Sequence, residues 1–451
     1  MKISSYHKQL GDNVFFHKGI NASYPFLQQW DRVYISTLFT YNWKITVDTI
    51  NFYKAIIDDI DRIKVGGILA TLKYDDLWEA TGVVPIKGLL NRPGMLGDDN
   101  EIIVDELIPD YSLFNDTPFK YSLVGDSYLG YSTRGCKNKC KFCGVPEIEP
   151  QFQDYINIKE YVNGIKNKYG EKTHLVLMDN NILASKSFNK IIRDIMELGF
   201  EKNSKLNNKQ RHVDFNQGVD ARRIDEKNIH TLAKIAINPL RIAFDSIKLE
   251  SVYRRGVELA AQNGIQNLSN YILYNYNDSP EELWKRLEIN IQLNRKYGLN
   301  IYSFPMKYIP LLDTNRKYIS SPNWNWQFIR GVQRILNVLK GAVMPREDFF
   351  YRAFGESEKE FREILYMPES ILMNRGRELQ TAEIDWKNKF RKLTQNERDE
   401  LLSILCGNPS RKGLMNSIAS IKNKKLHSIL TYYIPKRPEK NDYSALLDLE
   451  A

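Results

Sequence analysis

Strand and helix patterns alternate between residues 127 and about 310, and this alternation restricts the fold more than any other feature of the sequence. Short apolar runs typical of buried strands are separated by longer stretches with apolar residues at helical spacing. Such a succession of strand–helix units predicts a parallel sheet curved into a partial (β/α)6 TIM-like barrel, with chemistry at the carboxyl ends of the strands. The predicted strands are 128–132, 174–179, 212–216, 240–245, 270–276 and 300–305.

The predicted helices between these strands have apolar residues on one face. Ser279 and Glu282 form a capping box at the start of the last of them. These helices cover 187–200, 249–265 and 279–298.

The residues before the barrel predict a small, Rossmann-like α/β layer. Strands are expected over 13–17, 32–37 and 65–71, with a helix over 47–60. We expect this layer to form a domain over residues 1–115.

The residues after the barrel are mainly helical in pattern, with amphipathic stretches at 326–341 and 396–405. We therefore expect a barrel domain over 116–312 and a helical C-terminal region over 313–451. The last residues are expected to fray.

Composition restricts the cellular setting. Apolar residues make up 42% of the 451, enough for a sizeable core. No apolar run is long enough to span a membrane, and the first residues lack the apolar core of a secretory signal. Four cysteines at uneven spacing do not resemble a disulfide framework. These features favour a cytoplasmic protein without a membrane partner.

Three of the four cysteines lie within the stretch YSTRGCKNKCKFCGVPEIEP, directly after the first barrel strand. Cys136, Cys140 and Cys143 have the spacing C-x3-C-x2-C, and three thiolates on one loop suit a soft metal centre. A structural zinc site or an electron-transfer [4Fe–4S] cluster would normally use a fourth ligand, and none is near. Three ligands leave a coordination position open, as a catalytic centre needs. Cys406 is expected to be a small apolar helix residue, and three unrelated surface thiols are the alternative.

This cysteine loop, with the aromatic Phe142 before its last cysteine, resembles the radical S-adenosylmethionine (radical SAM) superfamily. The resemblance implies that the three cysteines each ligate one iron of a [4Fe–4S] cluster, and that SAM occupies the fourth iron. Phe142 would lie beside the adenine. The implied reaction is reductive cleavage of SAM to methionine and a 5′-deoxyadenosyl radical, which abstracts hydrogen from a substrate.

Later strand ends resemble the branch that includes methylthiotransferases and cobalamin-type radical SAM enzymes. The segment LMDNNILAS resembles its second-strand segment, and RIAFDSIKLESVYRRG its fourth-strand segment. By this resemblance, the residues near SAM are Asp179, Asn180, Asn181, Asp245, Ser246 and Arg254 or Arg255.

Three further strand ends give candidates or depart from the branch. At the third strand end, Gln217, Asp220 and Arg222 are expected to face the cavity. At the sixth, Lys307 and Tyr308 are expected to line the substrate side. At the fifth, the glycines usual in the branch are replaced by Asn275, Tyr276 and Asn277, so a close approach of this backbone to SAM is not expected.

The N-terminal domain is similar to B12-binding domains through the stretch VGGILAT and through YHKQLGDNVFF. The loop that supplies the lower cobalt ligand in that family is absent. His7 stands in a different context, where a surface helix position is expected. The domain is therefore interpreted as a degenerate relative, and cobalamin as an unlikely cofactor.

The substrate cannot be read from the sequence: a small molecule, an RNA or a peptide are all open. No cysteines precede Cys136, which argues against a second cluster. An electron donor such as flavodoxin or ferredoxin is the expected partner. The rivals are a cobalamin-dependent radical methyltransferase, an iron–sulfur regulatory module without SAM turnover, and a nucleic-acid-binding protein. The nucleic-acid-binding alternative is motivated by the net charge of +9 and by the basic C-terminal helices. Aromatic side chains of that region that could stack on bases are Trp324, Trp326 and Tyr432.

Overall fold

The computed structural model describes residues 1–20, 30–115, 117, 121–375, 381–407 and 411–434. It divides into two compact units. The first comprises Met1–Ile242, Leu259–Ile265 and Ile309–Tyr318, and the second Ala243–Glu258, Gln266–Tyr308 and Ile319 onward. The fold is α/β, as expected. No helix in the described ranges is long and apolar enough to cross a membrane.

The first unit begins with a small α/β layer. Its strands β1 (Val33–Thr37) and β2 (Ile63–Gly67) pair in parallel, with Val33 opposite Ile63. Buried apolar side chains of both strands and of the helices form its core. Its helices are α1 (Lys2–Gln9), α2 (Trp43–Lys54), α3 (Ile68–Leu72) and α4 (Tyr74–Thr81).

The strand expected over 13–17 is wrong. These residues have no regular secondary structure, and the Phe15 side chain is 58% exposed. The apolar residues Val14, Phe15 and Phe16 fit the pattern of a strand, but no strand within the described residues pairs with them.

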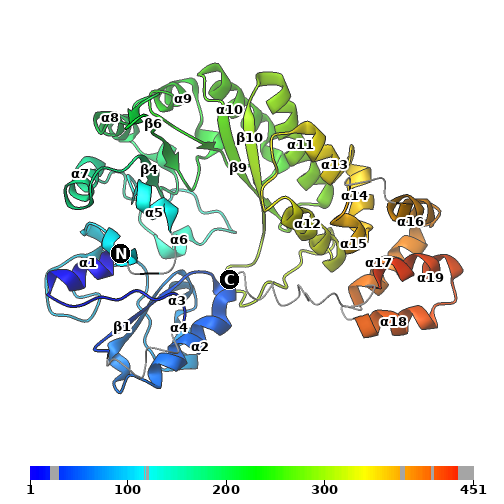
Figure 1. The fold of residues 1–451 in the computed structure, drawn as a ribbon, viewed down its shortest axis with the longest axis horizontal. Helices are drawn as coiled ribbons and strands as arrows, with labels where there is room; N and C mark the ends of the chain where they lie inside the picture. The colour runs from blue at the N-terminus through cyan, green and yellow to red at the C-terminus, as the bar shows by residue number, and fades with distance from the viewer. Residues whose placement is uncertain (21–29, 116, 118–120, 376–380, 408–410, 435–451) are drawn as a thin grey trace. The chain divides into compact units, whose positions relative to one another are not determined.

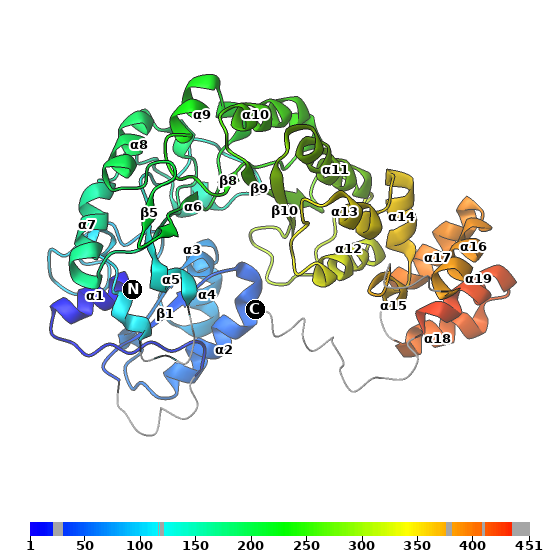
Figure 2. The same cartoon turned by 45° about the horizontal axis from the view of Figure 1, so that its top comes forward.

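The rest of the first unit carries a parallel sheet in the order β3–β4–β7. The connecting helices cover one side of this sheet, seen in green in Figures 1 and 2. Isolated parallel bridges, such as Val219 to Ile242, continue the pairing beyond β7. The strands are β3 (Ser127–Gly130), β4 (His174–Leu177), β7 (Val213–Phe215) and β8 (Leu240–Arg241), and the helices α7 (Ile158–Tyr169), α8 (Phe188–Glu197) and α9 (Glu226–Leu232).

The second unit contains the parallel pair β9 (Asn267–Tyr274) and β10 (Asn300–Lys307), with Asn267 opposite Asn300. Between them lies α11 (Pro280–Tyr297), whose capping box at Ser279 and Glu282 is confirmed. α10 (Glu250–Gln262) precedes β9.

The remaining helices of this unit, yellow to red in Figure 1, share one large apolar core with α11. Leu283 and Trp284 of α11 contribute to that core together with Phe328 and Phe350. These helices are α12 (Trp326–Val338), α13 (Glu347–Phe354), α14 (Glu358–Tyr366), α15 (Glu369–Leu372), α16 (Thr381–Arg391), α17 (Gln395–Gly407), α18 (Arg411–Ser420) and α19 (Lys424–Leu430). The domain boundaries at 115 and 312 stay predictions.

Candidate metal centre

The cysteine loop, residues 131–150, starts directly after β3 and so lies at the carboxyl edge of the sheet. Its base is closed by backbone pairing: the amide of Arg134 donates to the carbonyl of Gln153 at 3.1 Å, and the reverse bond measures 2.9 Å. The short helix α6 (Val145–Ile148) forms its final part. The loop is therefore anchored at both ends where ligands of open parallel sheets bind.

Asp179, at the end of β4, fixes the start of the loop. Its fully buried carboxylate accepts hydrogen bonds from the hydroxyls of Ser132 and Thr133 at 2.6 and 2.7 Å, and from their amides at 3.0 and 2.6 Å. Burial raises the pKa of Asp179, and these donors oppose that rise. The carboxylate is thus engaged by the loop itself, and its contact with the SAM amino group stays a prediction.

Glu149 fixes the other side of the loop. One oxygen, Oε1, accepts from the Arg134 guanidinium at 2.7 and 3.0 Å. The other, Oε2, accepts from the Gly135 amide at 2.7 Å and from the Asn180 side chain at 2.9 Å. Glu149 therefore joins the two ends of the loop to the end of β4. Its hydrogen bond also engages the side-chain amide of Asn180, which was predicted to lie near SAM.

The position before Cys136 requires glycine. Gly135 has φ +74°, and a Cβ there would lie 2.4 Å from the carbonyl oxygen of Gln151. Both the left-handed backbone and the close approach exclude a side chain.

The three cysteines are half-buried, and none of the four in the chain forms a disulfide. The amide of Cys143 donates to the carbonyl of Cys140 at 3.0 Å, which makes a tight turn of the last two. Phe142, between them, is partly buried. Among the residues that the structure describes, no three His, Cys, Asp or Glu side chains converge as a ready metal site.

Asn181 lies against the first cysteine. Its Nδ2 donates to Cys136 Sγ at 3.6 Å, and the Asn138 amide donates to the same sulfur at 3.4 Å. Asn181 is 1% exposed, yet its buried Oδ1 has no hydrogen-bond partner. This buried oxygen needs a donor, which a water molecule or a bound ligand with an N–H or O–H would supply.

Asp220 and Arg222, after β7, hold the middle of the loop. Asp220 accepts from Asn138 Nδ2 at 2.8 Å and from the Arg222 guanidinium at 2.8 Å through each oxygen. Burial alone would raise the pKa of Asp220, but these hydrogen bonds outweigh it and lower the pKa. The hydrogen bonds to Asp220, first, and then the neighbouring Cys140 raise the pKa of Arg222. The third predicted residue of this segment, Gln217, is exposed and contacts Asn216.

The other predicted SAM residues belong to the second unit. Asp245 is partly buried, and Ser246 caps a short 3-10 helix. Arg254 donates to Glu250 at 2.7 Å and to Gln292 at 2.7 Å. Its guanidinium is engaged on the helix surface, and its contact with the SAM carboxylate stays a prediction.

A buried ion pair missed by the sequence reasoning organises the strand ends of this unit. Arg286 of α11 is 0% exposed and binds Asp278 at 2.5 Å. It also donates to the carbonyls of Asp245 at 3.1 Å and Leu273 at 2.7 Å. The available signal was an arginine between Leu283 and Leu287, whose helical spacing predicts a buried face.

The fifth-strand turn replaces glycine with asparagine. Asn275 is fully buried and adopts φ +65°, a conformation that asparagine tolerates better than most residues. Its side chain accepts from the Ser320 amide at 2.8 Å and donates to the carbonyl of Tyr308 at 3.2 Å. The glycine-like backbone is therefore kept, while the added side chain fastens the turn. Lys307 and Tyr308 follow at the end of β10 and are partly buried.

His7 is not the surface residue that was expected. It is 8% exposed, with Nδ1 2.7 Å from Asp12 and Nε2 2.7 Å from the Tyr34 hydroxyl. Helix α1 packs the face that carries His7 against the rest of the domain, and the neighbouring Tyr6 is also buried. Both ring nitrogens are occupied by neighbours.

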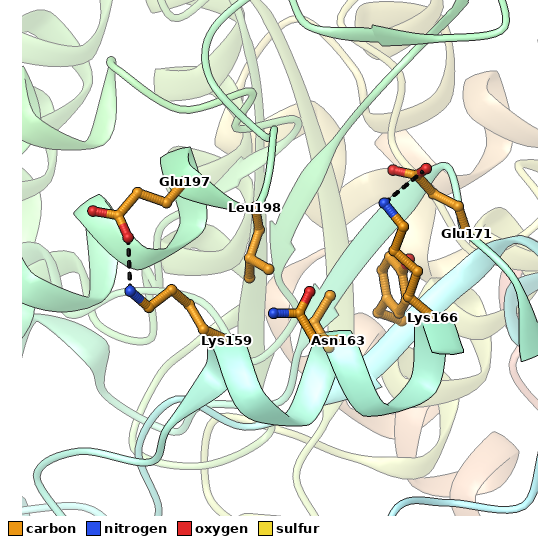
Figure 3. A pocket seen from close by; sticks show the side chains of 8 residues that line it. Lys159, Asn163, Lys166, Glu171, Glu197 and Leu198 are labelled. Carbon is orange, nitrogen blue, oxygen red and sulfur yellow. Dashed lines mark hydrogen bonds and ion pairs between the residues drawn. The ribbon is translucent and has the colours of Figure 1, made fainter. Parts of the chain in front are cut away.

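A cavity of about 230 Å³ lies between α7 and the end of α8 (Figure 3). Its charged side chains are paired within it, Lys159 with Glu197 at 2.7 Å and Lys166 with Glu171 at 3.1 Å. Tyr128, near the start of β3, also lines it. No residue of the cysteine loop lines the cavity, which is therefore not part of the candidate site.

No family model and no curated protein matches the chain. Solved structures that are similar to it include TsrM of Kitasatospora setae, a radical SAM methyltransferase with cobalamin and a [4Fe–4S] cluster bound. The two are 14% identical, and the match covers 64% of this chain and 67% of TsrM with a TM-score of 0.46.

Two further structures are similar at 14% identity. Coproporphyrinogen III oxidase (HemN) of Escherichia coli, a radical SAM enzyme, matches with a TM-score of 0.32 over 48% of this chain and 52% of its own. SuiB of Streptococcus suis bound to precursor peptide SuiA matches with 0.34 over 72% and 73%. Radical SAM enzymes are the superfamily that the cysteine loop resembles. With all three TM-scores below 0.5, the functional argument rests on the residues of the chain itself.

Proposed function

We propose that this protein is a radical SAM enzyme with one [4Fe–4S] cluster. The observation that carries the proposal is the cysteine loop. Three thiols at C-x3-C-x2-C spacing follow the first parallel strand, on a loop fixed by two buried carboxylates, Asp179 and Glu149. The resemblance to the superfamily, drawn from the same residues, gives the reaction class.

The barrel belongs to this proposal. The first unit contains parallel strands β3, β4 and β7 with helices between them, and the second contains the parallel pair β9 and β10 around α11. We take these as successive parts of one partial six-stranded barrel.

The residues present fit a cluster with an open iron. Three soft thiol ligands come from one loop, and the unsatisfied Asn181 Oδ1 lies beside Cys136. When bound, a [4Fe–4S] cluster supplies the electron for cleavage of SAM to methionine and a 5′-deoxyadenosyl radical. Cys136, Cys140 and Cys143 would hold it, and binding requires their side chains to converge.

The remaining residues of the site would position the cysteine loop and bind SAM. Asp179 and Glu149 hold the loop in place, so little ordering of the backbone remains when a cofactor binds. Asn181 Oδ1, which has no hydrogen-bond partner, would accept a hydrogen bond from the SAM amino group, and Phe142 would pack against the adenine. The substrate remains open among small molecules, RNA and peptides.

The test uses full-length protein purified and reconstituted without oxygen. Iron and sulfide are counted, dithionite and SAM are added, and 5′-deoxyadenosine is measured. About four irons with SAM cleavage supports the proposal. A protein that takes up no iron overturns it, and a full cluster without cleavage, even with candidate substrates, favours a regulatory iron–sulfur module.

The three-cysteine assignment has its own test. We expect Cys136→Ala, Cys140→Ala and Cys143→Ala each to abolish the brown absorbance of the cluster, because each removes an iron ligand. Cys406→Ala is the matched control and should retain it, since Cys406 lies in α17 of the other unit. Loss of iron from the Cys406 variant would contradict the assignment.

A cobalamin-dependent methyltransferase is the second candidate. Leu38 and Phe39, directly after β1, are 52% and 44% exposed at the carboxyl edge of the β1–β2 pair, where α/β layers bind ligands. TsrM contains cobalamin, so the expected absence of this cofactor has no support from the comparisons. With both nitrogens of His7 occupied, cobalamin would bind without that ligand. Titration with hydroxocobalamin, followed by absorbance, decides: saturable binding that Phe39→Asp weakens supports it, and no binding excludes it.

A further inference from the structure

Two side chains from different strand ends lie against the cysteine loop. Asn181, after β4, places Nδ2 at 3.6 Å from Cys136 Sγ. Arg222, after β7, binds Asp220, which also holds Asn138 of the loop, and Cys140 contributes to the raised pKa of its guanidinium. Because β4 and β7 are neighbours in the parallel sheet, both donors reach the loop from the same edge.

Neither donor is loosely placed. Asn181 is 1% exposed, which restricts its side chain to the position beside the sulfur. The Arg222 guanidinium is half exposed, but Asp220 binds it through both carboxylate oxygens at 2.8 Å. Asp220 is in turn held by Asn138, which lies between the two cysteines concerned. The donors are therefore oriented by the protein.

N–H donors to cysteine sulfur act on the electrons of an iron–sulfur cluster. They stabilise negative charge on the sulfurs, and a cluster that has gained an electron carries more of it. Each such hydrogen bond therefore favours the reduced form, and a guanidinium adds its positive charge.

We propose that Asn181 and Arg222 set the reduction potential of the cluster by donating to the sulfurs of Cys136 and Cys140. The proposal rests on the proposed function. It adds two positioning residues that favour the reduced form of the cluster. The step is a one-electron reduction without a proton: the cluster gains one electron, and an external carrier of the flavodoxin or ferredoxin class loses one.

The test measures the midpoint potential of the reconstituted full-length protein by dithionite titration with redox dyes, followed by electron paramagnetic resonance. The variants are Asn181→Leu and Arg222→Met, with iron counted first in each. We expect both to retain iron and to show a more negative potential than the wild type. Arg222→Lys should restore part of the shift, since it keeps the charge and one donor.

Arg223→Met is the matched control. It removes the same charge from the adjacent position, but no hydrogen bond to a cysteine sulfur involves Arg223 among the described residues. Its potential should stay close to that of the wild type. A shift equal to that of Arg222→Met would assign the effect to bulk charge and overturn the proposal, as would unchanged potentials in both test variants.

The outcomes separate this inference from the proposed function. If the wild type takes up no iron, the proposed function itself fails. If Asn181→Leu alone loses iron, the Arg222 variants decide, because that side chain is half exposed and its removal leaves the core unchanged.

Discussion

At the scale of single residues, the two carboxylates that hold the cysteine loop are more informative than the cysteines. A cysteine trio shows which atoms are available, whereas Asp179 and Glu149 show that the chain fixes the loop at defined points. Buried charges are costly unless they are paired or hydrogen-bonded, and both carboxylates are.

Glu149→Gln should weaken the loop. The substitution keeps the shape but removes the negative charge that pairs with Arg134, whose side chain is only 14% exposed. The guanidinium would then keep only its longer contact with Asp105, at 3.4 Å. Loss of the closer charged partner should lower the free energy of unfolding by about 2 kcal/mol, measured by urea denaturation, and reduce iron uptake. Glu147→Gln, two positions earlier and exposed, is the control and should leave both unchanged. Equal effects in the two variants would show that Glu149 does not hold the loop.

Gly135→Ala should prevent cluster binding. The left-handed backbone costs an alanine about 1–2 kcal/mol, and the added Cβ would lie 2.4 Å from a backbone oxygen that cannot rotate away. We expect iron content after reconstitution to fall far below that of the wild type. Gly125→Ala, where a Cβ meets nothing within 4 Å, is the matched control. Full iron uptake by Gly135→Ala would mean that the loop adopts another path.

At the scale of elements, Asp110 joins α1 to the start of the 3-10 helix Tyr111–Phe114. Its buried carboxylate binds Lys8 at 2.8 Å and accepts from the hydroxyls of Ser4 and Ser112 at 2.6 Å each. Burial acts to raise the pKa of Asp110, but these partners outweigh it and hold the pKa well below its ordinary value.

A lowered pKa makes the contribution of Asp110 depend on pH. A carboxyl group with a folded-state pKa below its unfolded value of 3.8 contributes its full stability above that value, and loses it as the pH falls toward the folded pKa. The difference in unfolding free energy between the wild type and Asp110→Asn should therefore be constant above about pH 5 and shrink in more acidic solution. Urea denaturation across pH measures it, and a difference that grows on acidification would contradict the assignment.

The sequence predicted the parallel elements well, because each strand is a short apolar run between helical stretches. Each of the six barrel strands occurs within its predicted range or one to three residues from it, although 240–245 is reduced to β8 with two residues. Helix α7 and the small hairpin β5 (Lys205–Leu206) and β6 (Lys209–Gln210) were not predicted. The hairpin could have been predicted from its turn residues Asn207 and Asn208, because asparagine is common at the positive φ angles that both adopt.

The site was predicted less completely than the fold. The spacing of the cysteines is local and can be read directly. The partners of Asp179 lie 46 and 47 positions away. The carbonyls of Phe244 and Leu273 that accept from Arg286 lie 42 and 13 positions away, so only the folded chain brings these groups together. Glu149 was missed because a glutamate in a loop is usually solvated.

At the scale of the whole molecule, the net charge of +9 includes cations of the C-terminal helices that are held in ion pairs. Examples are Arg391 with Glu363 at 3.0 Å, Lys389 with Asp385 at 3.0 Å, and Lys387 with Glu383 at 2.9 Å. Trp324, considered for base stacking, is instead buried and donates to the Asp278 carbonyl at 3.0 Å.

We therefore expect weak binding to polyanions. Cations already paired with carboxylates release fewer counterions from a phosphate backbone, so the protein should elute from heparin below about 0.15 M salt. Retention to much higher salt, with a steep dependence of affinity on salt concentration, would favour the nucleic-acid-binding alternative.

The bonds that fix the two ends of the cysteine loop all lie within the first 180 positions, since Glu149, Asp179 and Asn180 supply them. Proteins are synthesised from the N-terminus, and domains fold as they emerge. A nascent chain on the ribosome thus has the residues that fix both ends of its cysteine loop while more than half of the 451 residues are still to be translated. The cellular machinery that delivers iron and sulfide would meet a formed acceptor loop well before the last helices exist.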